Sequence, residues 1–209
     1  MAKNLLRSVA LLILSVGLMA GSASASPVIT VINTFGPSNT FDLNNSYFVE
    51  AGHQEIAVPF TISEPLTITQ IAVAATGTDI QVRIASNGPG NLPATPFFGG
   101  LGFDANGFFT FSPCVSCGTL PSAGTYWFIM TGAILFPDEI DWFDNALGLV
   151  GTVALDNFTD GWHTVSGSLP ALAVYGTTPV PEPASLTSFA CAIILGLVVV
   201  QMTTRTRSG

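Results

Sequence analysis

The sequence predicts an all-β protein, an antiparallel β-sandwich of jelly-roll-like type between an N-terminal signal peptide and a single C-terminal transmembrane helix. Two observations predict the fold class. Short runs rich in Val, Ile, Thr and aromatic residues recur along residues 26–178, and clusters of Gly, Pro, Asn and Ser separate them. No part of this region keeps a helical period, and short strands with frequent turns are typical of β-sandwiches.

The expected strands are short and partly alternate apolar with polar residues, most clearly over residues 79–84. In chain order the runs are residues 26–35, 55–62, 66–75, 79–86, 107–112, 125–132 and 169–176. The turn clusters are residues 86–93, 98–107 and 121–124. These boundaries predict that the apolar runs at 66–75 and 79–86 are separate strands, and that the glycine-rich residues 98–107 form a turn.

Residues 1–25 have the pattern of a secretory signal peptide. Lys3 and Arg7 precede an apolar stretch of twelve residues at 9–20, and small residues ending at Ala25 follow it. Signal peptidase would cut after Ala25. The apolar stretch is shorter than a comfortable membrane span, so a retained N-terminal anchor is the less favoured alternative.

The C-terminal segment, residues 179–209, carries a second export signal. Residues 184–202 form an apolar stretch of nineteen residues, and Arg205 and Arg207 follow it. That length is sufficient to cross a hydrocarbon core, and the arginines favour a cytoplasmic end. A buried core helix is the alternative. The sequence therefore predicts one transmembrane helix that anchors the chain before processing.

The residues ahead of this helix, "VPEPASL" at 180–186, resemble the PEP-CTERM sorting domain of exported bacterial proteins. The resemblance implies that an exosortase recognises Pro181, Glu182 and Pro183 and processes the chain near them. It also implies a Gram-negative bacterium that makes extracellular polysaccharide, with the protein at the cell surface or in the extracellular matrix. The chain departs from the family pattern in its tail, where Thr206 separates two arginines in place of a denser cluster.

The region between the signals is strongly acidic. Residues 26–178 contain twelve of the thirteen acidic residues and only Arg83 of the five Lys and Arg residues, a formal net charge of −11. Nucleic-acid binding needs lysines and arginines to replace phosphate counterions, so this charge excludes it. The charge suits solubility in an extracellular matrix and permits cation binding by carboxylates.

The order of segments in this region resembles a second family. "FGPSNTF" at 35–41, "QEIAVPFTIS" at 54–63, "LPSAGTYWFIMTG" at 120–132 and "LPALAVYGT" at 169–177 together resemble the choice-of-anchor R domain. This is a surface-protein module found upstream of several anchoring signals. The resemblance covers roughly residues 28–178. It implies a β-rich surface domain and names no activity or site.

Two cysteines form the sequence Cys114-Val115-Ser116-Cys117 between expected strands. Turn residues surround them, and an exported chain meets an oxidising compartment, so a local disulfide between Cys114 and Cys117 is the favoured interpretation. Redox activity would need a helix N-terminus to lower a thiol pKa. Zinc binding would need further ligands from His53 and His163. Pairing with another chain stays open.

Acidic residues cluster in the sequence "FPDEIDWFDN" at 136–145. Calcium takes six to eight oxygen ligands, and clustered carboxylates supply them. The candidate ligands are Asp138, Glu139, Asp141 and Asp144. The spacing differs from that of an EF-hand, and the alternative is a solvated acidic loop. Calcium is the one cofactor that the sequence suggests.

Trp142 and Trp162 lie beside acidic and amide residues, an arrangement typical of sugar-binding surfaces, where an indole stacks on a pyranose ring. The favoured alternative is that both rings fill the core, as we expect for Trp127.

No GxSxG nucleophile motif is present, and no pair of carboxylates stands out, so the sequence predicts no enzyme. We expect a non-enzymatic structural or adhesive component associated with extracellular polysaccharide. A carbohydrate-binding module is the first alternative, and a polysaccharide-active enzyme is the second.

Overall fold

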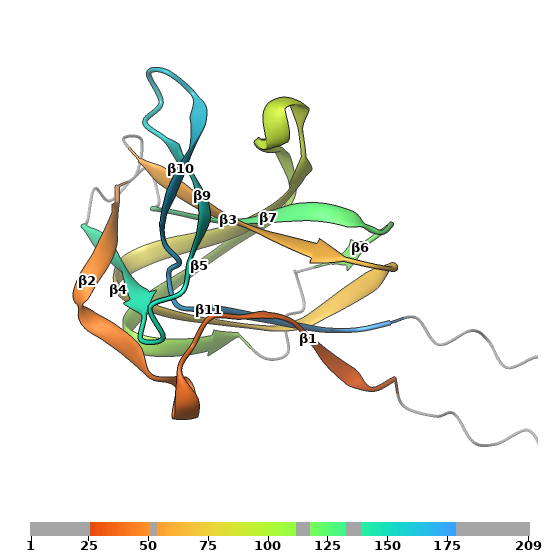
Figure 1. The fold of residues 1–209 in the computed structure, drawn as a ribbon, viewed down its shortest axis with the longest axis horizontal. Helices are drawn as coiled ribbons and strands as arrows, with labels where there is room; N and C mark the ends of the chain where they lie inside the picture. The colour runs from red at the N-terminus through yellow and green to blue at the C-terminus, as the bar shows by residue number, and fades with distance from the viewer. Residues whose placement is uncertain (1–25, 51–53, 112–117, 133–138, 179–209) are drawn as a thin grey trace, which may run out of the picture. The chain divides into compact units, whose positions relative to one another are not determined.

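The computed structural model describes residues 26–50, 54–111, 118–132 and 139–178, and this part of the chain is all-β (Figure 1). It holds eleven strands and two short 3-10 helices, Pro37–Asn39 and Pro89–Asn91. The strands are β1 Val28–Asn33, β2 Phe41–Val49, β3 Glu55–Ile62, β4 Leu66–Asn87, β5 Pro93–Phe111, β6 Thr119–Leu120, β7 Gly124–Gly132, β8 Ile140–Asn145, β9 Val150–Asp156, β10 Trp162–Ser168 and β11 Leu172–Thr177. Their pairings are antiparallel. The predicted all-β, antiparallel class is therefore confirmed.

Strand β4 organises the domain because it pairs with different strands along its length. The hydrogen-bonded path runs β1-β11-β4-β7-β3-β9-β10. The first part of β4 pairs with β11 and its second part, Ile80–Ser86, pairs with β7. Strand β5 accompanies β4 through both parts. The β4–β5 hairpin thus joins the β1–β11 side of the fold to the β7–β3–β9–β10 side.

A bulge marks the point where β4 changes partner. The β4–β5 register shifts between Gly77 and Ile80, and Gly77 and Asp79 have φ angles of 137° and 49°. A Cβ at Gly77 would lie 2.8 Å from Cγ1 of Ile140, so a larger residue would not fit there. Bulges bend a strand and increase its twist. The predicted strands 66–75 and 79–86 are therefore one bent strand, not two.

The glycine-rich residues 98–107 were expected to form a turn, and this prediction is wrong, because they belong to β5. Gly99 shows why glycine suits this strand. Its φ is 136°, and an added Cβ would lie 2.5 Å from the Cα of Arg83 and 2.5 Å from the carbonyl oxygen of Val82. The separately predicted turn at residues 86–93 is confirmed, because it contains the 3-10 helix Pro89–Asn91.

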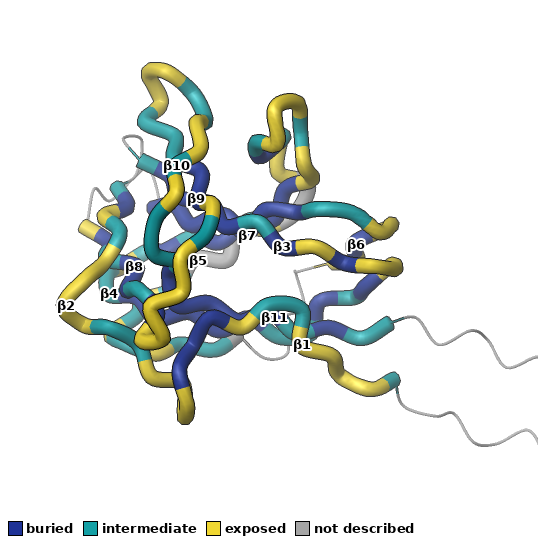
Figure 2. The backbone as a smooth tube through the Cα atoms, viewed as in Figure 1, coloured by how far each residue is buried: buried dark blue, intermediate teal, exposed yellow. Residues whose placement is uncertain are grey.

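Side chains alternate between two faces of β7, and this alternation defines the core. Tyr126, Phe128 and Met130 pack into the main hydrophobic cluster, with β3 and β4 side chains such as Ile56 and Ile84. Trp127 and Ile129 point to the opposite face and belong to a separate buried cluster. Trp127 is 2% exposed, so the expectation that it lies inside is confirmed. Figure 2 shows the buried backbone concentrated along β4, β7 and β11.

Both predicted export signals lie outside the described residues. These signals are the signal peptide with its cleavage site at Ala25, and the sorting motif Pro181, Glu182 and Pro183 with its apolar segment. Cys114 and Cys117 also lie outside the described ranges. Within those ranges no helix is long and apolar enough to cross a membrane.

Candidate functional site

The candidate site is the face of β4, β7, β3, β9 and β10 that points away from the main core, called the outer face below. Cross-strand pairing places Arg83 opposite Ile129, Ala57 opposite both Ile129 and Ala154, and Trp162 opposite Asp156. Paired residues in a sheet share a face. The outer face comprises Gln81, Arg83, Ala85, Trp127, Ile129, Thr131, Glu55, Ala57, Ala154, Asp156 and Trp162.

An ion pair between Arg83 and Glu55 lies on this face. Nη1 of Arg83 donates to Oε1 of Glu55 at 3.1 Å, and Nη2 donates to Oε1 of Gln81 at 3.3 Å. The side chain of Glu55 is 9% exposed and that of Arg83 is 30% exposed. Arg83 is the only Lys or Arg residue of residues 26–178. The fold thus directs the one strong cation of this region to a largely desolvated carboxylate.

Burial dominates the electrostatics of Glu55. Desolvation raises the pKa of Glu55, and repulsion from Asp156 raises it further. A hydrogen bond from Thr131 and the charge of Arg83 act in the opposite direction without cancelling the rise. Asp156 is its cross-strand neighbour on β9. The buried surroundings of Glu55 therefore disfavour its ionised form, and the ion pair with Arg83 favours it.

Aromatic rings and small side chains occupy the rest of the outer face. Ala57, Ala85 and Ala154 are fully buried in one cluster with Trp127 and Ile129, and the half-buried ring of Trp162 packs against this cluster. Alanine leaves room for a ring to lie close to the sheet. Trp162 therefore packs on a buried apolar cluster and keeps part of its ring exposed.

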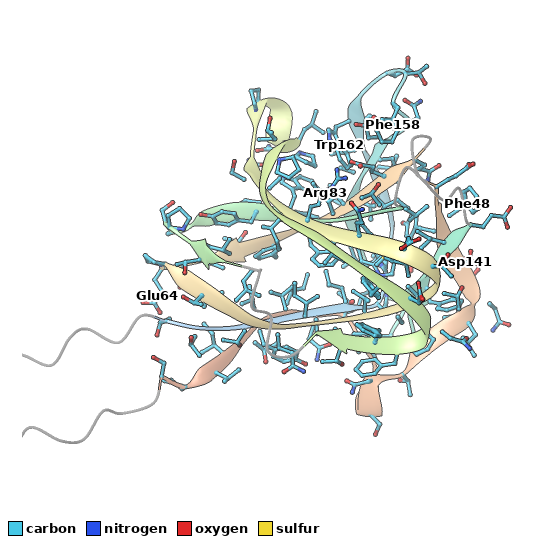
Figure 3. All side chains as sticks on the ribbon, turned by 180° about the vertical axis from the view of Figure 1, so that it is seen from behind. Phe48, Glu64, Arg83, Asp141, Phe158 and Trp162 are labelled. Carbon is cyan, nitrogen blue, oxygen red and sulfur yellow. The ribbon has the colours of Figure 1, made fainter. Side chains whose placement is uncertain are left out.

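The neighbouring polar groups reinforce this arrangement. Nε1 of Trp127 donates to Oδ1 of Asn87 at 2.8 Å, which fixes one end of the face. Figure 3 shows Arg83 and Trp162 in the same part of the domain, with Phe158 beyond Trp162. A partly exposed indole, a guanidinium and two carboxylates thus share one surface.

The loop between β9 and β10 borders the outer face and is held rigidly. Oδ1 of Asp156 accepts a hydrogen bond from the backbone N–H of Phe158 at 2.7 Å. Oδ1 of Asn157 accepts from the N–H groups of Thr159 and Asp160 at 3.1 and 2.9 Å. Phe158 is 51% exposed and has a φ of 60°. These side-chain turns present Phe158 at the hairpin tip.

Of the two predicted sugar-binding tryptophans, only Trp162 is on this surface. Trp142 is fully buried, and its Nε1 donates to the carbonyl oxygen of Ala171 at 3.1 Å. Its ring packs on that of Phe128, with centroids 5.6 Å apart. The prediction of a glycan contact at Trp142 is therefore wrong. The physical reason is that Trp142 lies on the inward face of β8, between exposed or half-exposed acidic neighbours.

Among the described residues, the predicted calcium ligands do not gather into one site. Residues 140–145 form strand β8, and an odd separation places Asp141 and Asp144 on opposite faces of it. Oδ1 of Asp141 accepts a hydrogen bond from Oγ of Ser46 at 2.8 Å, and Glu139 is exposed. Asp138 lies outside the described ranges. Nowhere in the described part of the chain do three or more His, Cys, Asp or Glu side chains gather to hold a metal.

Sequence reasoning missed the Arg83–Glu55 pair as a site. The available signal was compositional, because a single basic side chain in a region of net charge −11 is unusual. Its partner lies 28 residues away on another strand, so no sequence pattern distinguishes Glu55 from the other acidic residues.

Comparison with known proteins does not assign a family. No family model matches the chain, and no curated protein matches it. Among solved structures, one chain of a complex between a serine protease of Aeromonas sobria and its chaperone is similar over 78% of this chain, with 12% identity and a TM-score of 0.27. The match covers 29% of that protein's chain, and so low a score carries no argument about fold or activity.

Proposed function

We propose that the chain is an exported surface or matrix protein of a Gram-negative bacterium, sorted by an exosortase, and that it acts as a non-enzymatic adhesive or structural component associated with extracellular polysaccharide. The sequence of both termini and the acidic charge of residues 26–178 support this proposal. The all-β domain, which we interpret as a jelly-roll-like β-sandwich, is its working part. Signal peptidase and an exosortase are its partners during export.

We place the polysaccharide contact on the outer face. The observation that carries this proposal is the position of Arg83, held by buried Glu55 on the same surface as the partly exposed ring of Trp162. The apolar face of a pyranose stacks on an indole. Sugar hydroxyls accept hydrogen bonds from a guanidinium and donate to a carboxylate such as Asp156. The ligand class is therefore a hydroxyl-rich, weakly charged glycan, because the acidic domain repels a polyanion.

A polysaccharide-active enzyme is the second candidate, and one observation favours it. The pKa of Glu55 is raised, and Asp156 is its cross-strand neighbour. Glycosidases use two carboxyl groups, of which one has a raised pKa and acts as the acid. If Glu55→Gln abolishes turnover of host polysaccharide and leaves its binding intact, this candidate replaces the adhesive function.

The adhesive function is tested by retention of the exported, processed protein in gels that contain extracellular polysaccharide from the producing bacterium. We expect saturable retention, and we expect Trp162→Ala to weaken it about tenfold. Phe48→Ala is the matched control, because Phe48 is another partly exposed ring and lies on β2, away from the outer face. No retention of the unaltered protein, or an equal effect of the two substitutions, would refute a contact at this face.

A further inference from the structure

Strand β2 contains an expanded bulge that the proposed function does not use. Phe41 and Asp42 pair with Asn145 and Asp144, and the next pair is Ser46 with Phe143. Residues 43–45 therefore have no opposite residue on β8. Residues 43–46 are exposed, and Leu43 is 68% exposed. The chain bulges from an otherwise regular antiparallel pair and presents a short accessible segment.

This segment contains the sequence Asn44-Asn45-Ser46, an Asn-x-Ser acceptor for N-linked glycosylation. Such acceptors occupy surface loops of exported proteins. We propose that Asn44 is the site at which an oligosaccharide is attached to the exported chain. This inference rests on the export that the proposed function includes, and is independent of the outer face.

The local geometry orients the amide of Asn44. Oδ1 of Asp42 accepts hydrogen bonds from the backbone N–H of Asn44 at 2.9 Å and from its Nδ2 at 3.1 Å. Nδ2 of Asn45 donates to Oδ2 of the same carboxylate at 2.7 Å. The nitrogen that would become glycosylated is thus held against an exposed carboxylate at the surface. An amide nitrogen is a weak nucleophile, and a hydrogen bond to a carboxylate increases its electron density.

A second acceptor sequence, Asn157-Phe158-Thr159, provides an internal contrast. Asn157 is half-buried, and its Oδ1 accepts two backbone N–H groups of the loop. Its Nδ2 donates to Oδ2 of Asp160 at 3.1 Å. The Nδ2 contact matches that of Asn44, so the contrast lies in the two backbone hydrogen bonds to Oδ1, which binding in an enzyme's active site would break, and in the partial burial of Asn157. We therefore expect glycosylation at Asn44 and not at Asn157.

The reaction is a glycosyl transfer from an oligosaccharide carried on a polyprenyl diphosphate. A bond forms between Nδ2 of Asn44 and the anomeric carbon, and the bond from that carbon to the diphosphate oxygen breaks. The polyprenyl diphosphate leaves with the electron pair, and Nδ2 loses one proton to a carboxylate base. No oxidant or reductant is needed. The enzyme would be a membrane oligosaccharyltransferase that faces the exported side.

The test is mass spectrometry of the full chain expressed in its producing bacterium and recovered from the envelope and medium. Trypsin separates the two acceptors, because Arg83 is the only Lys or Arg between residues 26 and 178. The peptide that ends at Arg83 contains Asn44, and the peptide that begins at Ile84 contains Asn157. We expect an oligosaccharide mass on the first peptide only.

Variants test whether the acceptor sequence is read. Ser46→Ala should remove the added mass completely, whereas Ser46→Thr keeps the acceptor sequence and should retain it. Asn157→Gln should have no effect. The same spectra report the N-terminus of the first peptide. A chain that begins at Ser26 but carries no sugar on Asn44 would overturn this inference while export stands. A chain that retains residues 1–25 and carries no sugar would contradict the predicted cleavage after Ala25, and would then count against export and not against Asn44 as the acceptor.

Discussion

Two desolvated carboxylates in this domain differ in one respect. Glu55 on the outer face has Arg83 at 3.1 Å, whereas in the described part of the chain Asp144 on β8 has no basic partner, and its buried Oδ1 accepts no hydrogen bond. Burial raises the pKa of both groups. For Asp144 a hydrogen bond from Ser168 lowers the pKa, and repulsion from Asp42 raises it. Both sites retain an acidic residue in surroundings that disfavour its charge.

The comparison of Glu55 with Asp144 shows whether a buried carboxylate in this domain needs a cation beside it. Buried ion pairs contribute little net stability compared with well-packed apolar residues, but removing one partner is strongly destabilising. Asp144 shows that this fold tolerates a desolvated carboxylate without a cation. The Arg83–Glu55 pair is therefore not explained by a general need to neutralise buried acids. This is consistent with a role for Arg83 in contacting a ligand.

The largest effect should come from removing the cation. Arg83→Met keeps much of the side-chain volume and leaves the largely buried carboxylate of Glu55 without a cation. We expect a loss of about 2–3 kcal/mol in the free energy of unfolding, below the full range for buried pairs because Arg83 is 30% exposed. Urea denaturation measures this loss.

The matching double variant, Arg83→Met with Glu55→Gln, should recover most of that loss, because no unpaired charge then remains on the outer face. Equal stability of the single and double variants would mean that the lost packing of Arg83, and not the unpaired charge of Glu55, causes the effect.

The raised pKa values of Glu55 and Asp144 should together make the stability of the domain depend on pH. A carboxyl group with a raised pKa in the folded chain binds its proton more tightly there than in the unfolded chain. Its contribution to stability is complete below the ordinary pKa, 4.5 for Glu55 and 3.8 for Asp144, and is lost as the pH rises through the raised value. Thermal melting from pH 4 to pH 8 should therefore show falling stability.

The double variant Glu55→Gln with Asp144→Asn should flatten this curve. Glu64→Gln with Glu139→Gln is the matched control, because it removes the same charge from two exposed positions. A control curve as flat as that of the double variant would assign the effect to overall repulsion within the acidic domain.

The sequence predicted local features of the fold better than its pairings. The run 55–62 has the same bounds as β3, because β-branched and aromatic residues define a strand locally. The union of 66–75 with 79–86 depends on a bulge that packs Gly77 against Ile140, a contact between distant residues. The alternation of acidic and apolar residues over 139–142 indicates a strand in which Trp142 faces inward. The many carboxylates in this stretch favoured its interpretation as a loop instead.

Replacing the unpaired carboxylate should have a smaller and opposite effect to replacing Arg83. Asp144→Asn removes a desolvated charge and keeps the shape of the side chain. We expect stabilisation of no more than about 1 kcal/mol at neutral pH, since Asp144 is only partly buried. Glu55→Gln is the comparison, because it also removes the ion pair with Arg83 and so should gain less. Destabilisation by Asp144→Asn would mean that its charge is satisfied in solution.

The smallest effect should come from Asp42, which pairs with Asp144 across β2 and β8. Asp42→Asn removes a negative charge that raises the pKa of Asp144, so the pKa of Asp144 should fall towards its ordinary value. Carboxyl carbon shifts followed by NMR through an acid titration measure this change residue by residue. The pKa of Glu55 should stay the same, because its causes are its own burial and then its neighbours Thr131, Arg83 and Asp156 on the outer face. A shift at Glu55 as large as that at Asp144 would show that the two carboxylates respond to the charge of the whole domain, and the contrast between a paired and an unpaired acid would then lose its local basis.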